Sequence, residues 1–340
     1  MDQADVITQL MGEAQKALIS SEDDKAGALY DLYRTSINNL IEDLQKLNSK
    51  WYDLEEPTFS DWKRLGLDSE SFNLVTQRMG VFGGGLKQEV VNQFSKNLSN
   101  FWKENYLRTA YVVDSAVPPT VDIGFQMPPD SFLTDYLNQP FQGTRYSEDL
   151  GIITDVMAHD IHAQLVLSMW SGDSTDKMAD RIRDDVGIDP DEKLKTRPRA
   201  SAQLSRAVTI ARTEMADAAT KAQDYLFAQN QDLLDGKVWT AAFNGVLTCD
   251  ACAERDGLTP SEIDELGDDL EDDPPGHPRC RCRWAPLVKA WDELLGPTLS
   301  KGMVNDIELP SGPVKPVPYE TWSNDYVSPG GFVEIHAEVR

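Results

Sequence analysis

The stretch that decides the fold class is residues 200–229, ASAQLSRAVTIARTEMADAATKAQDYLFAQ. Its apolar side chains recur at steps of three and four residues, which is the period of one face of an α-helix. Alanine has the highest helix propensity, and its short side chain lets neighbouring helices approach closely. We therefore predict a long helix that packs against other helices, with these residues facing inward: Leu204, Val208, Ala211, Met215, Ala218, Ala222, Tyr225 and Leu226.

The same helical period recurs through most of the preceding chain. Residues 2–19 and 29–47 predict two helices, and Ser21 with Asp24 between them resembles a capping box that starts the second one. Further stripes predict helices over residues 86–116 and 147–171.

Short glycine-containing segments predict interruptions between these helices. Gly172-Asp173-Ser174 ends one helix, and Ser174 caps a short helix that reaches Val186. The run Gly83-Gly84-Gly85 lacks the lysine and the preceding strand of a phosphate-binding loop, so we predict that it forms a flexible hinge.

After Gly236 the pattern changes from helix to strand. Residues 237–243, KVWTAAF, and residues 282–288, CRWAPLV, predict two paired strands, and Asn244-Gly245 is typical of a turn. The predicted fold is mainly α, with a helical N-terminal and central bundle, a small C-terminal β-containing Cys/His module and an extended Pro-rich tail. The expected parts are a helical domain (1–116), a Pro-rich connector (117–147), a second helical part (148–235), the Cys/His module (236–295) and an extended arm (296–340).

The charge of the chain excludes a protein that coats nucleic acid. The 32 Lys and Arg residues face 57 Asp and Glu residues, which gives a formal net charge of −25 and repels phosphate. Residues 193–212 differ because they contain no acid. Their cations either pair with acids elsewhere in the chain or contact a polyanion such as packaged DNA or an acidic partner: Lys193, Lys195, Arg197, Arg199, Arg206 and Arg212.

The sequence gives no indication of a membrane or secreted protein. A span needs about 20 mostly apolar residues, and the most apolar stretch, residues 152–170, is interrupted by acids and histidines. The N-terminus is acidic and lacks the basic and apolar regions of a signal peptide. We expect a protein made in a cytoplasm and kept there, or in a particle assembled there.

All four cysteines lie in one short region, which indicates a single local site. The motif Cys249-Asp-Ala-Cys252 is followed by His277-Pro-Arg-Cys280-Arg-Cys282. Two thiolates separated by two residues can reach one ion, and a second cluster about 25 residues later can complete a tetrahedral zinc site. The alternatives are a disulfide or free structural thiols. Five candidate ligands compete for four positions, and their spacing does not select the set.

A catalytic role for this region has less support. A catalytic zinc needs an open coordination position and a nearby base, and although Glu254 and Asp256 are near in sequence, nothing fixes them at the site. A nucleophilic pair of His277 and Cys280 has no helix that would align it. The acid-rich run between the two motifs lacks the ligand spacing of a calcium-binding loop, so we expect a solvated loop.

Residues 145–290 resemble the phage Mu F-like minor head protein family, also called phage head morphogenesis proteins. Four pieces carry the resemblance in the family's order. They are Trp170-Ser-Gly-Asp-Ser174, the helix that opens with Ile210-Ala-Arg-Thr-Glu214, Trp239 followed by Cys249-Asp-Ala-Cys252-Ala-Glu-Arg-Asp256-Gly257, and His277-Pro-Arg-Cys280-Arg-Cys282. The family usually has an aspartate a few residues after the tryptophan, where this chain has Asn244, and the acidic insert before His277 is a second departure.

The resemblance implies a structural minor capsid protein of a tailed phage and not an enzyme. Such a protein acts near the portal vertex in head assembly, and we expect it to contact the portal protein, the major capsid protein or both, and to be retained in the virion interior. The other hypothesis is a zinc-dependent nuclease or hydrolase associated with DNA packaging, with His277 and Asp256 in the site and residues 193–212 gripping a polyanion.

Overall fold

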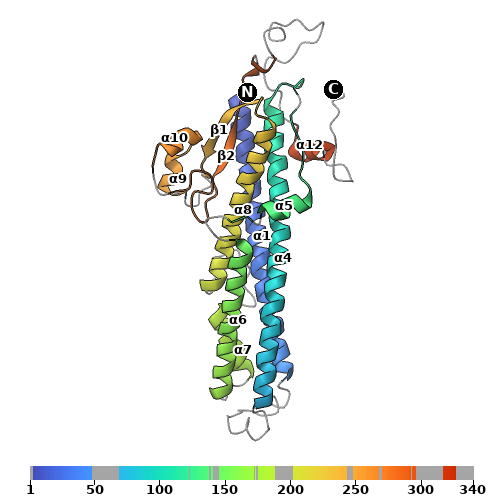
Figure 1. Ribbon diagram of the computed structural model, residues 1–340, viewed down its shortest axis with the longest axis vertical. Helices are drawn as coiled ribbons and strands as arrows, with labels where there is room; N and C mark the ends of the chain where they lie inside the picture. Colours follow the sequence, from blue (N-terminus) through green and yellow to red (C-terminus); the bar gives the residue numbers. More distant parts are fainter. Residues whose placement is uncertain are drawn as a thin grey trace. The chain divides into compact units, whose positions relative to one another are not determined.

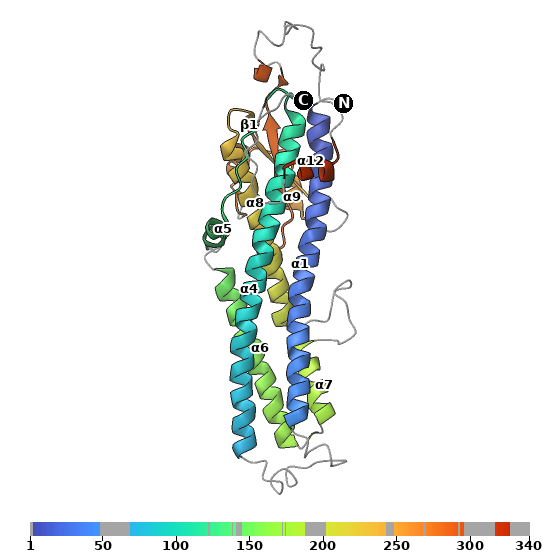
Figure 2. The ribbon, with the colours of Figure 1, turned by 90° about the vertical axis from the view of Figure 1, so that its right-hand side faces the viewer.

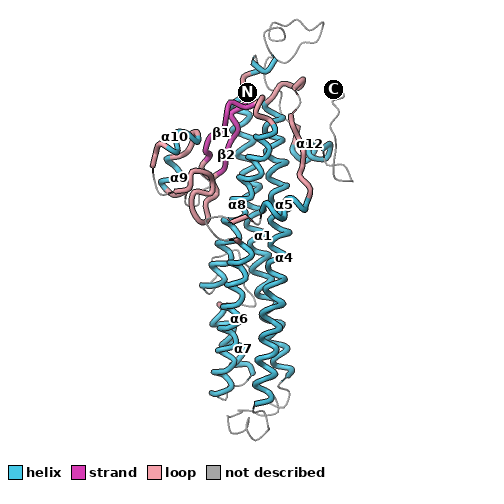
Figure 3. Tube along the Cα trace, in the orientation of Figure 1, coloured by secondary structure: helices cyan, strands magenta, loops and turns pink. Residues whose placement is uncertain are grey.

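The computed structural model describes most of the helical part of the chain and the Cys/His module. The described residues are 3–47, 69–121, 123–137, 139–140, 145–171, 173, 175–187, 202–242, 248–267, 270–291, 293–295 and 317–326. As predicted, the described fold is mainly α (Figure 3). The elements are α1 (Gln3–Leu47), α4 (Ser69–Ala116), α5 (Asp130–Leu137), α6 (Tyr146–Ser171), α7 (Thr175–Val186), α8 (Ala202–Gln229), β1 (Leu234–Thr240), α9 (Asp250–Glu254), α10 (Pro260–Asp264), β2 (Arg283–Val288) and α12 (Tyr319–Tyr326).

The chain divides into two compact units. Unit one comprises Met1–Glu22, Leu98–Leu137 and Thr213–Arg340, and unit two comprises Asp23–Asn97 and Asn138–Arg212. Helices α1, α4 and α8 contribute residues to both units. Among the helices that the structure describes, none has the length and apolarity needed to cross a membrane.

Unit one has an aromatic and alanine-rich helical core with a small sheet beside it (Figure 1). Trp102 of α4 stacks on Tyr106 with ring centroids 5.3 Å apart, and the Tyr106 hydroxyl donates to Gln229 Oε1 of α8 at 2.9 Å. Helix α8 fills the same core with Ala218, Ala219 and Ala222, whose side chains are fully buried. The inward stripe predicted for this helix is therefore confirmed at Ala218 and Ala222.

Part of the predicted C-terminal arm forms a helix that packs on α4. Trp322 of α12 is buried, and its indole nitrogen donates to Asp114 Oδ2 at 2.8 Å. The Tyr111 hydroxyl donates to the carbonyl of Val317 at 2.6 Å, and the Arg108 guanidinium lies 4.4 Å from the centre of the Tyr319 ring.

Unit two is a bundle of the helical segments assigned to it, with α6 and α7 packed together (Figure 2). The Tyr33 hydroxyl and Thr154 Oγ1 lie 2.9 Å apart inside it. Phe94 meets Tyr146 edge to face, with ring centroids 5.3 Å apart. The apolar stripe predicted for residues 147–171 is confirmed, because Ile153, Met157, Ile161 and Leu165 are all buried.

Two predicted interruptions are wrong. Helix α1 runs without a break through Ser21–Asp24, and the Ser21 hydroxyl donates to Glu104 Oε2 at 2.8 Å instead of capping a new helix. Helix α4 likewise runs through Gly83–Gly85, where we expected a hinge. A Cβ added at Gly83 would lie 3.2 Å from Ala158 Cβ of α6, so this glycine permits a close helix contact. Tertiary packing has overridden the local preference of both segments.

Candidate metal centre

A two-stranded antiparallel sheet supports the cysteine motifs. The pair of predicted strands is confirmed as β1 and β2, although β1 begins and ends three residues before the predicted 237–243. They pair Trp239 with Trp284 and Thr240 with Arg283. The two tryptophan rings meet edge to face at 5.7 Å and are fully buried. The proposed turn at Asn244-Gly245 lies outside the described residues.

The outer edges of both strands are occupied by other groups. On β2, Gln223 of α8 donates to the Trp284 carbonyl at 2.7 Å and accepts from its amide at 3.2 Å. On β1, the Trp239 amide donates to the Leu258 carbonyl, and the Trp239 carbonyl accepts from Gly257, each at 2.8 Å. Gly257 has φ +83°, a conformation that favours glycine. Because unpaired strand edges tend to join other chains, these contacts keep the small sheet closed.

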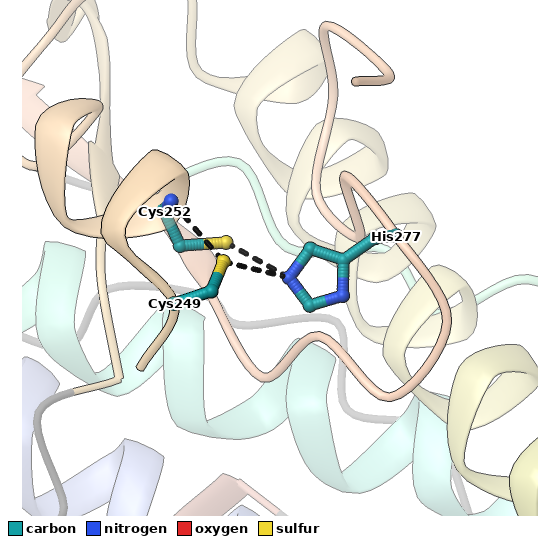
Figure 4. A group of neighbouring side chains, drawn as sticks. All are labelled: Cys249, Cys252 and His277. Carbon is teal, nitrogen blue, oxygen red and sulfur yellow. Dashed lines mark hydrogen bonds between the residues drawn. The ribbon is translucent and has the colours of Figure 1, made fainter. Parts of the chain in front are cut away.

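The first cysteine motif is shaped by the start of α9. Cys249 is the N-cap residue, and its Sγ accepts a hydrogen bond from the Cys252 backbone amide at 3.4 Å. This turn points the Cys249 and Cys252 side chains to the same side, as Figure 4 shows. The spacing of two residues therefore gives the paired thiols that the sequence predicted.

The second motif is held by a tight turn tied to α8. Arg279 has φ 64°, and its backbone amide donates to Thr213 Oγ1 at 3.1 Å. The Cys280 amide donates to the His277 carbonyl at 3.0 Å and closes the turn. Thr213 belongs to the Ala-Arg-Thr-Glu sequence of α8, so this motif positions the loop that carries His277 and Cys280.

The structure brings all five predicted ligands into one cluster of two overlapping triads. Cys249, Cys252 and His277 form one triad, and Cys252, Cys280 and Cys282 form the other; within each triad the ligand atoms lie within 4.8 Å of one another. Both Cys249 Sγ and Cys252 Sγ lie 3.2 Å from His277 Nε2, as the dashed lines in Figure 4 show. Cys252 Sγ lies 3.7 Å from Cys280 Sγ. Cys252 is common to both triads.

The chemistry of this donor set fits a zinc ion. With zinc–sulfur bonds of about 2.3 Å, two sulfurs on one tetrahedral ion lie about 3.8 Å apart, close to the separation of Cys252 and Cys280. All four cysteines are free thiols, and three of them are buried. Sulfur and imidazole nitrogen are the ligands of structural zinc. The residues present therefore suit the predicted metal, which would join two loops distant in sequence.

Hydrogen bonds among the buried thiols favour a thiolate in this cluster. The bonds from Cys252 and then Cys282 lower the pKa of Cys280, while the bond to Cys280 raises the pKa of Cys252. The His277 ring is oriented by a second contact, since its Nδ1 lies 2.9 Å from the Pro278 carbonyl. A carbonyl can only accept, so Nδ1 carries a proton, and this contact orients Nε2 toward the sulfurs.

The two carboxylates considered for catalysis do not belong to the clustered ligands. Asp256 Oδ1 accepts a hydrogen bond from the Ala241 backbone amide at 2.8 Å, which fixes the end of β1. Glu254 is the last residue of α9. Neither occurs among the groups of described residues close enough to share a metal. Asp256 thus makes a structural contact, and its place in a catalytic site, which the nuclease hypothesis assumes, stays a prediction.

Of the basic segment, residues 193–212, the structure describes only residues 202–212. Lys193, Lys195, Arg197 and Arg199 lie outside the described residues. Arg206 is exposed on α8, whereas Arg212 Nη2 binds Asp23 Oδ1 at 2.8 Å. For Arg212, pairing with an acid of the same chain is therefore the observed arrangement, while contact of the other cations with a polyanion or acidic partner stays a prediction.

Several supporting residues were not identified from the sequence. Buried Arg283 and partly exposed Arg281 face the buried Glu22 carboxylate, with N–O distances of 3.9 and 3.3 Å. Buried Arg255 donates to the Glu271 carbonyl and lies over the Trp239 ring. The only local signal was that basic residues recur inside and beside the cysteine motifs. Their acidic partner Glu22 is distant in sequence, so spacing could not reveal it.

The comparison with protein families agrees with this site. Residues 159–285 match the family model described as Phage Mu protein F like protein. The chain contains a phage Mu F-like region. This region spans α7, α8, β1 and all five clustered ligands. The match supports the identification as a phage head morphogenesis protein that the motifs predicted. No curated protein and no solved structure matches the chain significantly.

Proposed function

We propose that this protein is a structural minor capsid protein of a tailed phage that acts near the portal vertex during head assembly. The observation that carries the proposal is the Mu F-like match over residues 159–285, and the assembled Cys/His cluster lies within the matched residues. The members of this family are phage head proteins, which supports a location in the virion and a structural role instead of a catalytic one. We place the protein in the head interior, with the portal protein, the major capsid protein or both as its partners.

The Cys/His module acts in this proposal as a zinc-held clamp. A structural zinc contributes folding free energy to a region with little core of its own. Two of the five candidate ligands lie at the start of α9 and three in the segment before β2, and Thr213 and Gln223 tie this segment and β2 to α8. Zinc would supply only a rigid link here, and the helices beside the module would present the surfaces that dock on other head proteins.

Incorporation into heads tests this function. Purified particles made with the wild-type chain are expected to contain it in low copy, as measured by quantitative mass spectrometry of the heads. Cys252→Ser should reduce incorporation at least tenfold, because Cys252 belongs to both triads. Asp250→Ser is the matched control, since Asp250 is exposed in the same turn and is not a clustered ligand.

Two results would contradict the proposal. One is particles that assemble normally and lack the wild-type chain. The other is metal-dependent DNA cleavage by the purified protein that His277→Ala abolishes, which would favour the nuclease hypothesis.

A further inference from the structure

Helix α6 has a second apolar face on the side opposite its buried stripe. The buried face of this unit-two helix comprises Leu150, Ile153, Met157, Ile161 and Leu165. The outer face lies about half a turn away, and its side chains are exposed or half-buried: Ile152, Val156, His159, Ala163 and Val166 at alternating steps of four and three residues, with Leu167 next to Val166. All of them except His159 are apolar. Ile152 and Leu167 are 54% and 50% exposed.

This outer face is unusual for a surface helix. A helix at the surface of a globular protein normally carries one apolar stripe and a polar opposite side, whereas a helix that is apolar on both sides is normally buried. An alternation of four- and three-residue steps is the spacing with which one helix packs along another. Contiguous exposed apolar residues commonly mark interaction sites. The outer face therefore has the pattern of a surface that receives a helix.

The charges around the outer face indicate the character of that helix. Helix α6 contains Glu148, Asp149, Asp155 and Asp160 and no lysine or arginine. Asp160 also faces Asp185 of α7, and burial followed by the nearby Asp160 charge raises the pKa of Asp185. Two of the α6 acids are already paired, Asp155 with Lys87 of α4 at 2.8 Å and Glu148 with Arg145 at 3.6 Å. The negative charge that can attract a partner is therefore centred on the neighbouring Asp160 and Asp185. A second copy of α6 would set acids beside acids, which is unfavourable.

We propose that the outer face of α6 binds an amphipathic helix of another protein, one whose apolar stripe is flanked by lysine or arginine. The apolar residues supply the contact area, and the acids beside them select a basic partner over a second copy of this chain. This docking surface does not depend on the metal centre. It would serve as a binding surface in the assembly role proposed above, but its existence does not depend on that role.

Binding of two designed peptides to the full-length protein tests the proposal. Both are 28-residue helices with leucine and isoleucine at heptad a and d positions, one with lysine and one with glutamate at the flanking positions. Fluorescence anisotropy should show that the lysine peptide binds at least tenfold more tightly than the glutamate peptide. The preference should shrink at high salt because screening weakens exposed charge pairs.

Variants locate the binding site. Ile152→Ser combined with Leu167→Ser should weaken binding of the lysine peptide at least tenfold. Both side chains are about half exposed, so the fold should persist, which circular dichroism checks. The matched control is Val81→Ser, which removes an apolar side chain that is 69% exposed on α4. It should leave binding unchanged.

Other results would overturn the proposal. Equal binding of the two peptides, or binding that the double variant does not alter, would show that the outer face does not select a basic helix. Sedimentation that reveals a dimer lost on Ile152→Ser and Leu167→Ser would identify a second copy as the occupant. A result of this kind leaves the head-assembly function intact, because that function is tested separately by incorporation into particles.

Discussion

The Cys/His module and helical unit two keep their structures by different means. In the module, a two-stranded sheet and two short helices depend on a few specific links: sulfur and imidazole around Cys252, the Gln223 amide on β2 and the Glu22 carboxylate beside Arg283. In unit two, long helices bury an extended series of apolar side chains. A small region with few such links is sensitive to the loss of one of them, whereas distributed burial loses only a small share with each substitution.

The largest expected effect is the loss of the metal from the module. Chelation, or Cys252→Ser, should unfold the module locally because structural zinc sites contribute on the order of 10 kcal/mol in small zinc-binding peptides. Hydrogen exchange should accelerate across β1, α9 and β2, while α6 and α7 keep their protection. Equal acceleration in both regions would contradict the contrast between them.

A second prediction about the module concerns which of the five candidate residues bind the metal. Cys249 is exposed and belongs to one triad, and Cys282 is buried and belongs to the other. Serine at the position that does not bind the ion should leave metal content near wild type, and serine at a true ligand should lower it. Metal analysis of Cys249→Ser and Cys282→Ser thus shows whether either cysteine belongs to the ligand set. If both variants retain a full complement of metal, the remaining three residues hold the ion.

The next effect is the breaking of the buried ion pair. Glu22→Leu leaves the buried Arg283 guanidinium without its neutralising carboxylate, and removal of one partner of a buried pair typically costs about 3–5 kcal/mol. Denaturant unfolding of the variant should show this loss. The double variant Glu22→Leu with Arg283→Met should recover most of it. If Glu22→Leu is as stable as wild type, the ion pair has no structural role.

A smaller effect is expected at Tyr33 in unit two, and it depends on pH. Thr154 donates its proton to the Leu150 carbonyl at 2.8 Å, so the Tyr33 hydroxyl is the donor to Thr154. Burial raises the pKa of Tyr33 to about 12, above the ordinary value of 10.0. The folded state therefore favours the neutral phenol, and this contribution is complete below pH 10 and is lost as the pH rises towards 12.

Tyr33→Phe checks that assignment. It should reduce stability at pH 7 by about 1 kcal/mol, the typical value of a buried hydrogen bond. It should also weaken the fall in stability between pH 10 and 12, measured by denaturant unfolding at several pH values. If stability falls equally in wild type and variant between pH 10 and 12, other tyrosines cause the fall.

The smallest effect concerns the glycines of α4. A Cβ at Gly84 meets nothing within 4 Å, whereas one at Gly83 lies 3.2 Å from Ala158 Cβ. Gly84→Ala should therefore stabilise the protein by up to about 1 kcal/mol through helix propensity, and Gly83→Ala should gain less. Thermal unfolding measures both. A marked loss of stability in Gly84→Ala would favour a hinge at this position over the continuous helix.

Periodic and motif signals predicted most of the fold and the identity of the clustered ligands. The stripes of α6 and α8 and the strands around Trp239 and Trp284 follow from local pattern alone. The errors at Ser21–Asp24 and Gly83–Gly85 came from local preferences that tertiary contacts with Glu104 and Ala158 override. Glu22 and Thr213 were not predicted as supports of the module, because each meets its partner only after the chain has folded.

The metal content and ligand sphere of the purified protein test the central claim most directly. X-ray absorption spectroscopy with metal quantification should find one zinc per chain, coordinated by four ligands of which three or four are sulfurs at about 2.3 Å. Metal-free protein whose module shows full protection from hydrogen exchange would contradict the claim that a metal holds this region together.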